Sequence, residues 1–420
     1  MKSIAFLLLA AFPLAAGSDD SFLLRGVTVH TVSGQDIPNG SILVQDGKIM
    51  GVGAKLSAPK GVRIIEGKSL HVYPGIIDSG SEVGMVEIDS VRETTDLAEL
   101  GDFNPQLRTG VAVNPSSEHI PVTRANGITA MMTLPRGGMI AGQGSLMHLD
   151  GWTWEEMEIL RSGTMHINFP VLNPPPPRFG DSRAVPFAEA KKEYEAKLRA
   201  LHEFFEQCRR YQKAKSAGLP GFQADLKYEA MIPVLERKLP ALVTAVRERA
   251  VHDAVEFAGQ ENIRVILADV REPGKMLLEL KAKGIPVVLG KTLELPLNED
   301  DPYDASSSLP AQFYKAGVKF AFASFSASFS RNLPYQAANA VAFGLPYNEA
   351  LKAVTLNAAE IWGVGDKMGS IDEGKWADLM ITDGDPLEAK TQIKQLFIKG
   401  KPVDLENRHH MLYEKYLNRP

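Results

Sequence analysis

The chain has 420 residues, 44% of them hydrophobic, with 46 basic and 51 acidic side chains interspersed along its length. A chain of this size can bury a large core, and it exceeds the usual size of one compact domain. The net charge of −5, without basic blocks, argues against a nucleic-acid-binding protein. A single cysteine, Cys208, excludes a framework of disulfides, so stability must come from the core.

Residues 1–17 have the pattern of a secretory signal peptide. Lys2 provides a positive start, an apolar run extends from Ile4 to Ala16, and small residues close the run before Asp19. The run is short for a transmembrane span, which predicts cleavage near Ala16 or Gly17 and no stable membrane span afterwards. We therefore expect a periplasmic or secreted protein, with an uncleaved anchor as the alternative.

Short alternating strands at both ends of the chain predict one small β domain. Ser41–Val44 is joined to Ile49–Val52 through Asp46-Gly47, which is a hairpin signal because both central turn residues need positive φ. Similar strands are expected near the other end. We predict a composite β-sandwich with parts at residues 18–73 and 364–408 and a tail at 409–420, and its further strands are Phe22–His30, Ala377–Ile381 and strands within Ile393–Val403.

Between these ends, short apolar strands alternate with longer amphipathic stretches. This alternation predicts parallel strand pairing, and so many units favour an α/β fold with a closed (β/α)8 barrel of the TIM type at residues 74–363. A doubly wound open sheet is the alternative. The expected strands are Ile128–Leu134, Ile167–Leu172, Ala241–Val246, Val265–Ala268, Val287–Gly290 and Phe320–Ser324.

A Pro-rich helical insert is expected at about residues 173–225. Pro174–Pro177 enforce an extended, stiff lead, and Phe187–Lys215 is rich in Ala, Glu, Lys and Arg. Apolar residues recur in this helical stretch at three- and four-residue steps, which predicts one apolar stripe. A helix packed on the barrel is the simplest interpretation, and a subunit contact or a lid over the barrel mouth are the alternatives.

Four motifs carry a family resemblance by their order and spacing. They are Gly40–Val44 with Asp46–Ile49, then Tyr73–Asp78, Glu349–Ala359 and Gly369–Leu379. With these motifs the chain resembles the amidohydrolase superfamily, specifically its imidazolonepropionase-like branch, over nearly the whole mature chain. The resemblance implies a barrel whose strand ends hold one or two zinc or iron ions, which activate a water for attack on an amide or a similar carbonyl.

The metal-ligand positions that the resemblance implies carry other side chains. Ser79 and Ser81 stand where a His-x-His pair is expected, and the strand Leu239–Val246, which is expected to present a histidine, offers Thr244 and Ala245 instead. The next strand runs into Asp269, and the last strand runs into Phe325-Ser326 where an aspartate is expected. The ligand motifs are therefore degenerate, and we expect no metal and no other cofactor.

Histidines elsewhere in the sequence do not supply the missing metal ligands. His148 is assigned to an apolar loop, and His166 is assigned to the start of a strand rather than its end. A nucleophilic serine needs a base within hydrogen-bond reach, and no histidine is placed by sequence to serve. The Gly-rich stretch Arg136–Ser145 is interpreted as a tight turn at the barrel rim, because its spacing fits no phosphate-binding loop.

Polar residues expected at the barrel mouth form the candidate site. Asp269 and Glu82 are the candidate catalytic residues, because a buried carboxylate with a raised pKa can act as an acid or a base. A solvated surface is the alternative interpretation of the acidic stretch that contains Glu82. The candidate substrate-binding residues are Ser79, Ser81, Arg136, Thr244, Arg271, Ser324 and Ser326.

The leading hypothesis is a protein of the amidohydrolase type whose ancestor hydrolysed non-peptide carbon–nitrogen bonds in cyclic amides or related small molecules with a metal. In this chain we expect a metal-free pseudoenzyme with impaired or altered catalysis. An exported, non-catalytic protein that binds a small molecule or acts as a scaffold is the alternative. Metal-free hydrolysis driven by Asp269 or Glu82 is the third hypothesis. The expected partners are a small-molecule ligand and either a second copy or a related amidohydrolase subunit.

Overall fold

A computed structural model describes residues 20–172, 186–218 and 221–419. The predicted signal peptide and the run Pro174–Pro177 lie outside these ranges, so both stay predictions. Among the helices of the described ranges, none combines the length and the apolar character that crossing a membrane requires.

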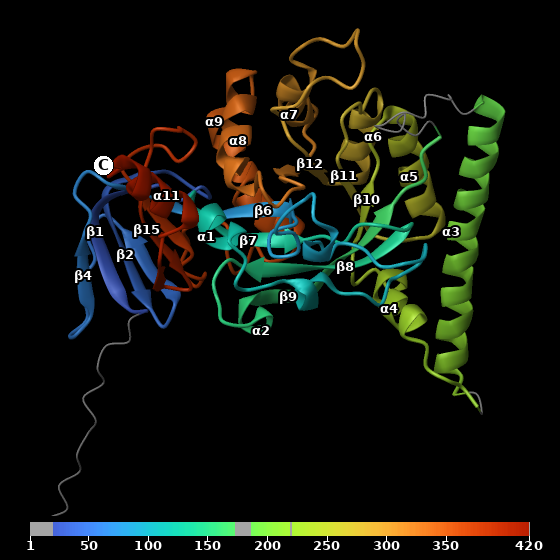
Figure 1. Cartoon of the computed structure of the whole chain (residues 1–420). Coiled ribbons are helices and arrows are strands. Elements are labelled where there is room, and N and C mark those ends of the chain that lie inside the picture. The colour runs from blue at the N-terminus through green and yellow to red at the C-terminus, as the bar shows by residue number, and fades with distance from the viewer. Residues whose placement is uncertain (1–19, 173–185, 219–220, 420) are drawn as a thin grey trace, which may run out of the picture.

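Both ends of the chain contribute strands to one eight-stranded sheet, seen on the left of Figure 1. The two halves meet where β14 (Leu379–Thr382) pairs antiparallel with β5 (His71–Pro74). The predicted Asp46-Gly47 turn is confirmed, with φ of 48° and 73°. A separate sandwich domain stays a prediction, because the strands form one sheet that branches at β1 (Phe22–Val29). The other strands are β2 (Ile37–Gln45), β3 (Lys48–Gly53), β4 (Arg63–Glu66), β15 (Ile393–Ile398) and β16 (Lys401–Val403).

A second eight-stranded sheet forms the nearly closed barrel in the centre of Figure 1. Its two edge strands are β6 (Ile76–Ser81) and β13 (Phe320–Phe322). A hydrogen bond of 2.8 Å from the Phe325 N–H, just after β13, to the Gly80 carbonyl in β6 connects them. The TIM-type barrel is thus supported. The strands in order are β6 (Ile76–Ser81), β7 (Ile128–Thr133), β8 (Ile140–His148), β9 (Glu158–Asn168), β10 (Ala241–Thr244), β11 (Val265–Ala268), β12 (Val287–Leu289) and β13 (Phe320–Phe322).

The prediction of eight uniform parallel units is wrong at β8, which runs antiparallel to both β7 and β9. Much of the stretch Arg136–Ser145, interpreted as a turn, lies in this strand. Its glycines allow close approach, since a Cβ on Gly144 would lie 2.7 Å from the Thr133 carbonyl oxygen. The inserted strand follows β7 through a short connection, as antiparallel neighbours can.

The predicted strand Ile167–Leu172 is also wrong, because β9 begins nine residues before it, at Glu158, and ends at Asn168. As a consequence, His166 lies near the carboxyl end of a barrel strand rather than at its start. His148 ends β8 instead of lying in a loop. Because β8 is antiparallel, His148 is at the opposite end of the barrel, where its Nε2 atom lies 3.1 Å from Asp378.

Helices cover the outside of the barrel, and β10 to β13 alternate with helices as predicted. The long helix α3 (Phe187–Ser216), on the right of Figure 1, confirms the predicted helix and packs on the barrel. Its Phe205 ring meets Phe257 edge to face at 5.3 Å between centroids. The other α-helices are α1 (His119–Arg124), α2 (Trp154–Met157), α4 (Leu226–Leu235), α5 (Glu248–Gln260), α6 (Met276–Lys283), α7 (Ala305–Ala316), α8 (Leu333–Ala342), α9 (Tyr347–Ala353), α10 (Leu356–Ile361) and α11 (Arg408–Leu417).

Alternation along the strands divides the barrel core into an inner and an outer layer. In β10, Leu242 belongs to the inner cluster together with Ile77 and Ile266. Its neighbour Val243 belongs to the outer cluster beneath the helices. Since successive side chains point to opposite faces, Thr244 shares the inner face with Leu242 and lies at the carboxyl end of the strand. Active sites of barrel enzymes lie at this end.

Candidate active site

A cavity of about 450 Å³ opens at the carboxyl ends of the barrel strands. Six of the nine candidate site residues line it, and three do not. The sequence did not identify four further polar residues of the lining. The predicted lining residues are Ser81, Glu82, Arg136, Thr244, Asp269 and Arg271, and the additional ones are His166, Asn168, Lys291 and Glu294.

Asp269 directly follows β11 and presents its carboxylate to this cavity. Its φ of 54° is left-handed, a conformation that aspartate tolerates better than most residues. Burial raises the pKa of Asp269 to about 6, while the nearby Arg271 acts in the opposite direction. Within the described residues, the carboxylate has neither a hydrogen-bond nor a salt-bridge partner. Asp269 is therefore available to a ligand and titrates close to neutral pH.

Glu82 supplies a second buried carboxylate, just after β6. It forms an ion pair with Arg136, and its side chain is 10% exposed. Burial raises the pKa of Glu82 to about 7, even though the Arg136 guanidinium favours the ionised form. Two carboxylates with different pKa values therefore share one cavity, which is the arrangement that separates a base from an acid.

His166 and Thr244 form a hydrogen-bonded pair in the cavity wall. The His166 Nδ1 atom lies 2.7 Å from the Pro135 carbonyl oxygen, and Nε2 lies 2.9 Å from Thr244 Oγ1. A carbonyl can only accept, so Nδ1 carries the proton. Burial lowers the pKa of His166, which keeps the imidazole neutral. Nε2 therefore accepts a hydrogen bond from the Thr244 hydroxyl.

The charges around the cavity are balanced. Arg271 lies 3.4 Å from Glu294, and Lys291 lies 3.5 Å from the same carboxylate. Arg136 faces Glu82 as described, and Asp269 is the third carboxylate of the lining. With His166 neutral, three cations meet three carboxylates when all are ionised. Such a cavity suits a small polar molecule without a large net charge.

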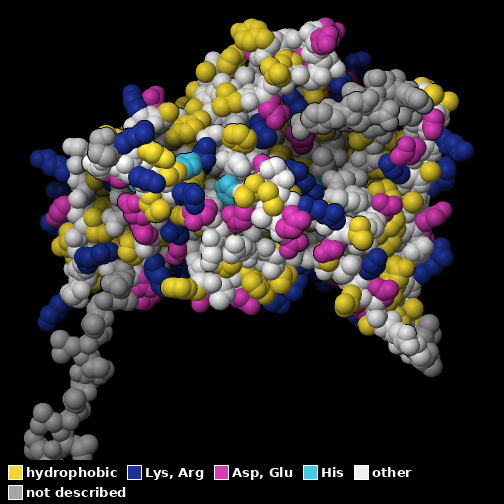
Figure 2. Space-filling view, in the orientation of Figure 1, with side chains coloured by type: hydrophobic (Ala, Val, Ile, Leu, Met, Phe, Trp, Pro, Cys, Tyr) yellow, Lys and Arg dark blue, Asp and Glu magenta, His cyan; other side chains and the backbone are white. Residues whose placement is uncertain are grey.

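The face of the molecule shown in Figure 2 carries charges of both signs. Figure 2 shows basic and acidic side chains intermixed over one face of the molecule, in keeping with their interspersed positions in the sequence. No single-sign field that would steer a polyanion or a polycation is visible on that face.

Three candidate binding residues, Ser79, Ser324 and Ser326, do not line the cavity. The buried carboxylate of Asp78 accepts hydrogen bonds from the Ser324 hydroxyl at 2.5 Å and from the Ser330 hydroxyl at 2.7 Å. Burial raises the pKa of Asp78, and these donors oppose that effect. This network joins β6 to the end of β13, so it holds the barrel closed. Ser324 is therefore placed in a structural network rather than at the mouth.

The other two serines, Ser326 and Ser79, also lie outside the cavity lining. The Ser326 hydroxyl accepts a hydrogen bond from the Phe329 N–H at 3.2 Å. Ser79 is fully buried, and its hydroxyl has no partner among the described residues. Gly80 lies between Ser79 and Ser81, and a Cβ at this position would lie 2.7 Å from the Phe325 ring. The Ser79-Gly80-Ser81 sequence thus permits Phe325 to pack against the end of β6.

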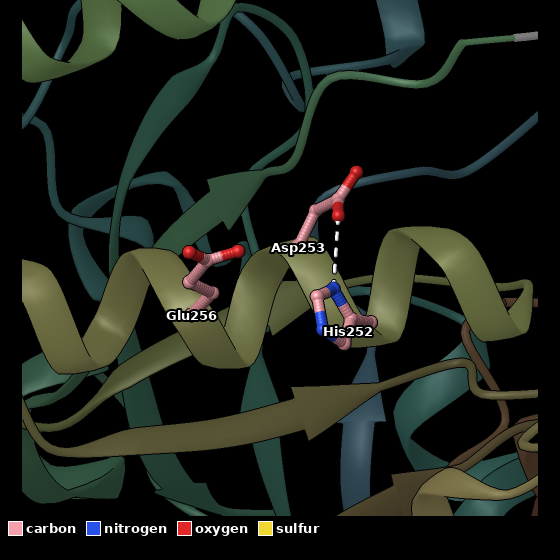
Figure 3. A group of neighbouring side chains, drawn as sticks. All are labelled: His252, Asp253 and Glu256. Carbon is pink, nitrogen blue, oxygen red and sulfur yellow. Dashed lines mark hydrogen bonds and ion pairs between the residues drawn. The ribbon is translucent and has the colours of Figure 1, made fainter.

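The side chains at the strand ends do not fit a catalytic zinc or iron site, which needs about three free protein donors. Both nitrogens of His166 are engaged, which leaves Asp269 as the free donor of these types. In the described part of the chain, only His252, Asp253 and Glu256 on α5 have metal-like spacing (Figure 3). That group lies outside the barrel, and Asp253 already accepts hydrogen bonds from Tyr194 and Arg249.

Comparison with known proteins identifies similar families and structures. The profile described as "Amidohydrolase family" matches residues 253–403. The protein "Amidohydrolase tasK" of Hapsidospora irregularis is 21% identical over 405 residues, covering 88% of this chain and 41% of that protein. The chain thus spans about two fifths of the length of this relative.

Solved structures resemble the fold along almost the whole chain. An amidohydrolase from Thermotoga maritima MSB8 has a TM-score of 0.81 at 25% identity, covering 91% of this chain and 99% of that one. Molinate hydrolase has a TM-score of 0.58 at 15% identity, covering 92% and 95%. At 15% identity this second likeness concerns the fold alone.

Proposed function

The matched profile and the structural neighbours support the amidohydrolase superfamily, and we propose that this chain hydrolyses non-peptide carbon–nitrogen bonds in small polar molecules without a resident metal. The imidazolonepropionase-like branch is part of the proposal. The observation that carries it is the pair Asp269 and Glu82, two buried carboxylates in one cavity whose pKa values are raised to about 6 and about 7.

The surroundings of the two carboxylates distinguish their roles. The Asp269 carboxylate has no partner among the described residues, so it is open to accept a proton from the attacking group as the base. Burial raises the pKa of Glu82 to about 7, which keeps part of this carboxyl protonated near neutral pH, and Glu82 is therefore assigned as the acid that protonates the leaving nitrogen. Arg271 and Lys291 line the same cavity, and fixed cations stabilise the negative charge that develops on a carbonyl oxygen.

The test is a hydrolysis assay with a panel of uncharged cyclic amides and N-acyl compounds. We expect a bell-shaped pH dependence of kcat/KM with limbs near pH 6 and pH 7. Asp269→Asn is expected to lower kcat by about 100-fold or more, which is the usual contribution of a general base. Asp300→Asn is the matched control, because Asp300 is exposed on the segment after β12.

Three outcomes would contradict the proposed function or a part of it. Full activity in Asp269→Asn would exclude this carboxylate as the base. Binding of panel compounds in calorimetry, without turnover by the wild type, would favour the alternative of a non-catalytic binding protein. Loss of activity on metal removal would contradict the metal-free part.

Export and assembly complete the proposal. A periplasmic or secreted location rests on the pattern of residues 1–17 alone. Association with a second copy or with a related amidohydrolase subunit likewise rests on the sequence. Cell fractionation and the mass of the purified protein in solution test these two points.

A further inference from the structure

We propose that Thr244 is a nucleophile of the barrel-mouth site and that His166 is its general base, so that hydrolysis passes through an acyl-threonine ester. This inference rests on the proposed function, because it assigns the attacking group of the same reaction to the protein. It concerns a hydroxyl that the sequence identified only as a binding group and a histidine that the sequence placed at a strand start.

The geometry has the three parts that activate a hydroxyl group. The Thr244 Oγ1 atom lies 2.9 Å from His166 Nε2, and the opposite ring nitrogen is held by the Pro135 carbonyl at 2.7 Å. A nucleophile, a base within hydrogen-bond reach and a third group that orients the base form the general logic of the catalytic triad. Here a backbone carbonyl fixes the tautomer that leaves Nε2 free to accept the hydroxyl proton.

Strand register brings the two residues together. In the parallel pair of β9 and β10, His166 is level with Leu242 and Asn168 is level with Thr244. Because successive side chains alternate between the two faces of a strand, all four residues lie on the inner face. The His166 imidazole, on β9, contacts Thr244 at the end of the neighbouring strand β10. The Asn168 amide donates to the Gly138 carbonyl at 2.9 Å, which holds the segment that carries the Pro135 carbonyl.

A purely structural hydrogen bond is the competing explanation for this pair, and two observations favour reactivity. First, Thr244 lines the open cavity, and its hydroxyl accepts no hydrogen bond from any described residue. Its lone pairs are thus available to an electrophile. Second, the adjacent strand end carries Asp269, since Thr244 is level with Ala268 in the β10–β11 pair. A base for the second step is therefore next to the nucleophile.

The reaction balances with one water molecule as the only co-reactant. Thr244 Oγ1 attacks the carbonyl carbon while its proton passes to His166 Nε2. The carbon–nitrogen bond breaks, and the leaving nitrogen takes a proton from the imidazolium or from Glu82. Water then gives a proton to Asp269 and attacks the ester carbon. The bond between that carbon and Oγ1 breaks, which releases a carboxylic acid. Oγ1 regains its proton from Asp269 if the imidazolium protonated the leaving nitrogen; if Glu82 did so, Oγ1 regains its proton from the imidazolium and the proton on Asp269 returns to Glu82 through solvent.

The test is covalent labelling of the full-length protein with p-nitrophenyl acetate and, separately, with a fluorophosphonate, followed by peptide mass spectrometry. We expect an adduct on Thr244 in the wild type and in Thr244→Ser, and none in Thr244→Val, which has the same shape without a hydroxyl. His166→Gln is expected to slow labelling by about 100-fold, the usual contribution of a general base. His252→Gln, on the outer helix α5, is the matched control and should label at the wild-type rate.

Each remaining outcome has a defined meaning. Absence of any Thr244 adduct in the wild type, or labelling that is unaffected by His166→Gln in a folded variant, would overturn the nucleophile assignment. If Thr244→Val also hydrolysed panel amides at the wild-type rate, the hydrolase proposal would stand without this step. Conversely, His166-dependent labelling of Thr244 without turnover of any panel amide would support the nucleophile and count against the hydrolase proposal. If His166→Gln did not fold, the Thr244→Val and Thr244→Ser pair would decide alone.

Discussion

Gly290 leaves the space that the Asp269 carboxylate occupies: a Cβ atom at position 290 would lie 2.7 Å from Asp269 Oδ1. Real Cβ atoms do not approach an oxygen so closely without displacement. The two residues follow neighbouring strands, β11 and β12, so the absence of a side chain on one permits the position of the other. The glycine therefore belongs to the site, although it contributes no reactive group.

The first prediction concerns this contact. Gly290→Ala should displace the Asp269 carboxylate and lower kcat by at least about tenfold, because a misplaced catalytic group loses its alignment. The change should leave the fold intact, as checked by circular dichroism. Gly259→Ala on α5 is the matched control, because a Cβ there meets nothing within 4 Å. Equal activity of the two variants would show that the contact does not position Asp269.

The second prediction is that Asp269 destabilises the fold at neutral pH. Its pKa is about 6 in the folded protein against an ordinary value of 3.8, so the folded state binds more protons between these pH values. Stability should therefore fall as pH rises from about 4 to 6, by about 3 kcal/mol in total. Asp269→Asn should recover about this much at pH 7.5 and nothing at pH 3.5, as measured by urea unfolding. The same gain at both pH values would contradict the assignment.

The third prediction concerns the closure of the barrel. Ser324→Ala removes a charge-assisted hydrogen bond to the buried Asp78 and should cost about 1.5–3 kcal/mol of unfolding free energy. Ser326→Ala is the matched control, because its hydroxyl accepts only from the exposed Phe329 N–H, and its effect should stay within about 0.5 kcal/mol. Comparable losses in both variants would argue against a special role of the Asp78 network.

The fourth prediction concerns metal dependence. Dialysis against a strong chelator should leave the hydrolysis rate and the unfolding midpoint unchanged, because the free donors at the strand ends number fewer than a catalytic metal requires. Elemental analysis before and after dialysis provides the control. Loss of activity that added zinc or iron restores would contradict the prediction and would reopen the search for ligands.

Several strands were predictable because their signals are local. Val265–Ala268 is a run of four apolar residues, and the strand has these same bounds in the structure. Ile128–Leu134 was predicted one residue too long at its end. Since the residue after such a strand faces the barrel mouth, the position of Asp269 at the site followed from the strand alone. Short buried runs with clear ends are thus readable from one sequence.

The stretch between β7 and β9 was not predictable in the same way. Its glycines are typical of a turn, yet they serve close packing between antiparallel strands. The first part of β9, Glu158–Thr164, lacks a regular alternation of apolar and polar side chains that would mark its beginning. Pairing with β8 defines this strand, and such pairing joins residues whose partners no local pattern reveals.

The sequence by itself determined that Ser81, Thr244 and Asp269 stand at or just after the ends of barrel strands, but it did not place the imidazole of His166 among them. Only the tertiary structure decided which of them act together. The register between β9 and β10 places His166 beside Thr244. Where β6 and β13 meet, the Ser324 hydroxyl donates a hydrogen bond to Asp78 instead of lining the cavity. The physical reason is that strand ends depend on local apolar runs, whereas contacts across strands depend on register and closure, which are properties of the whole sheet.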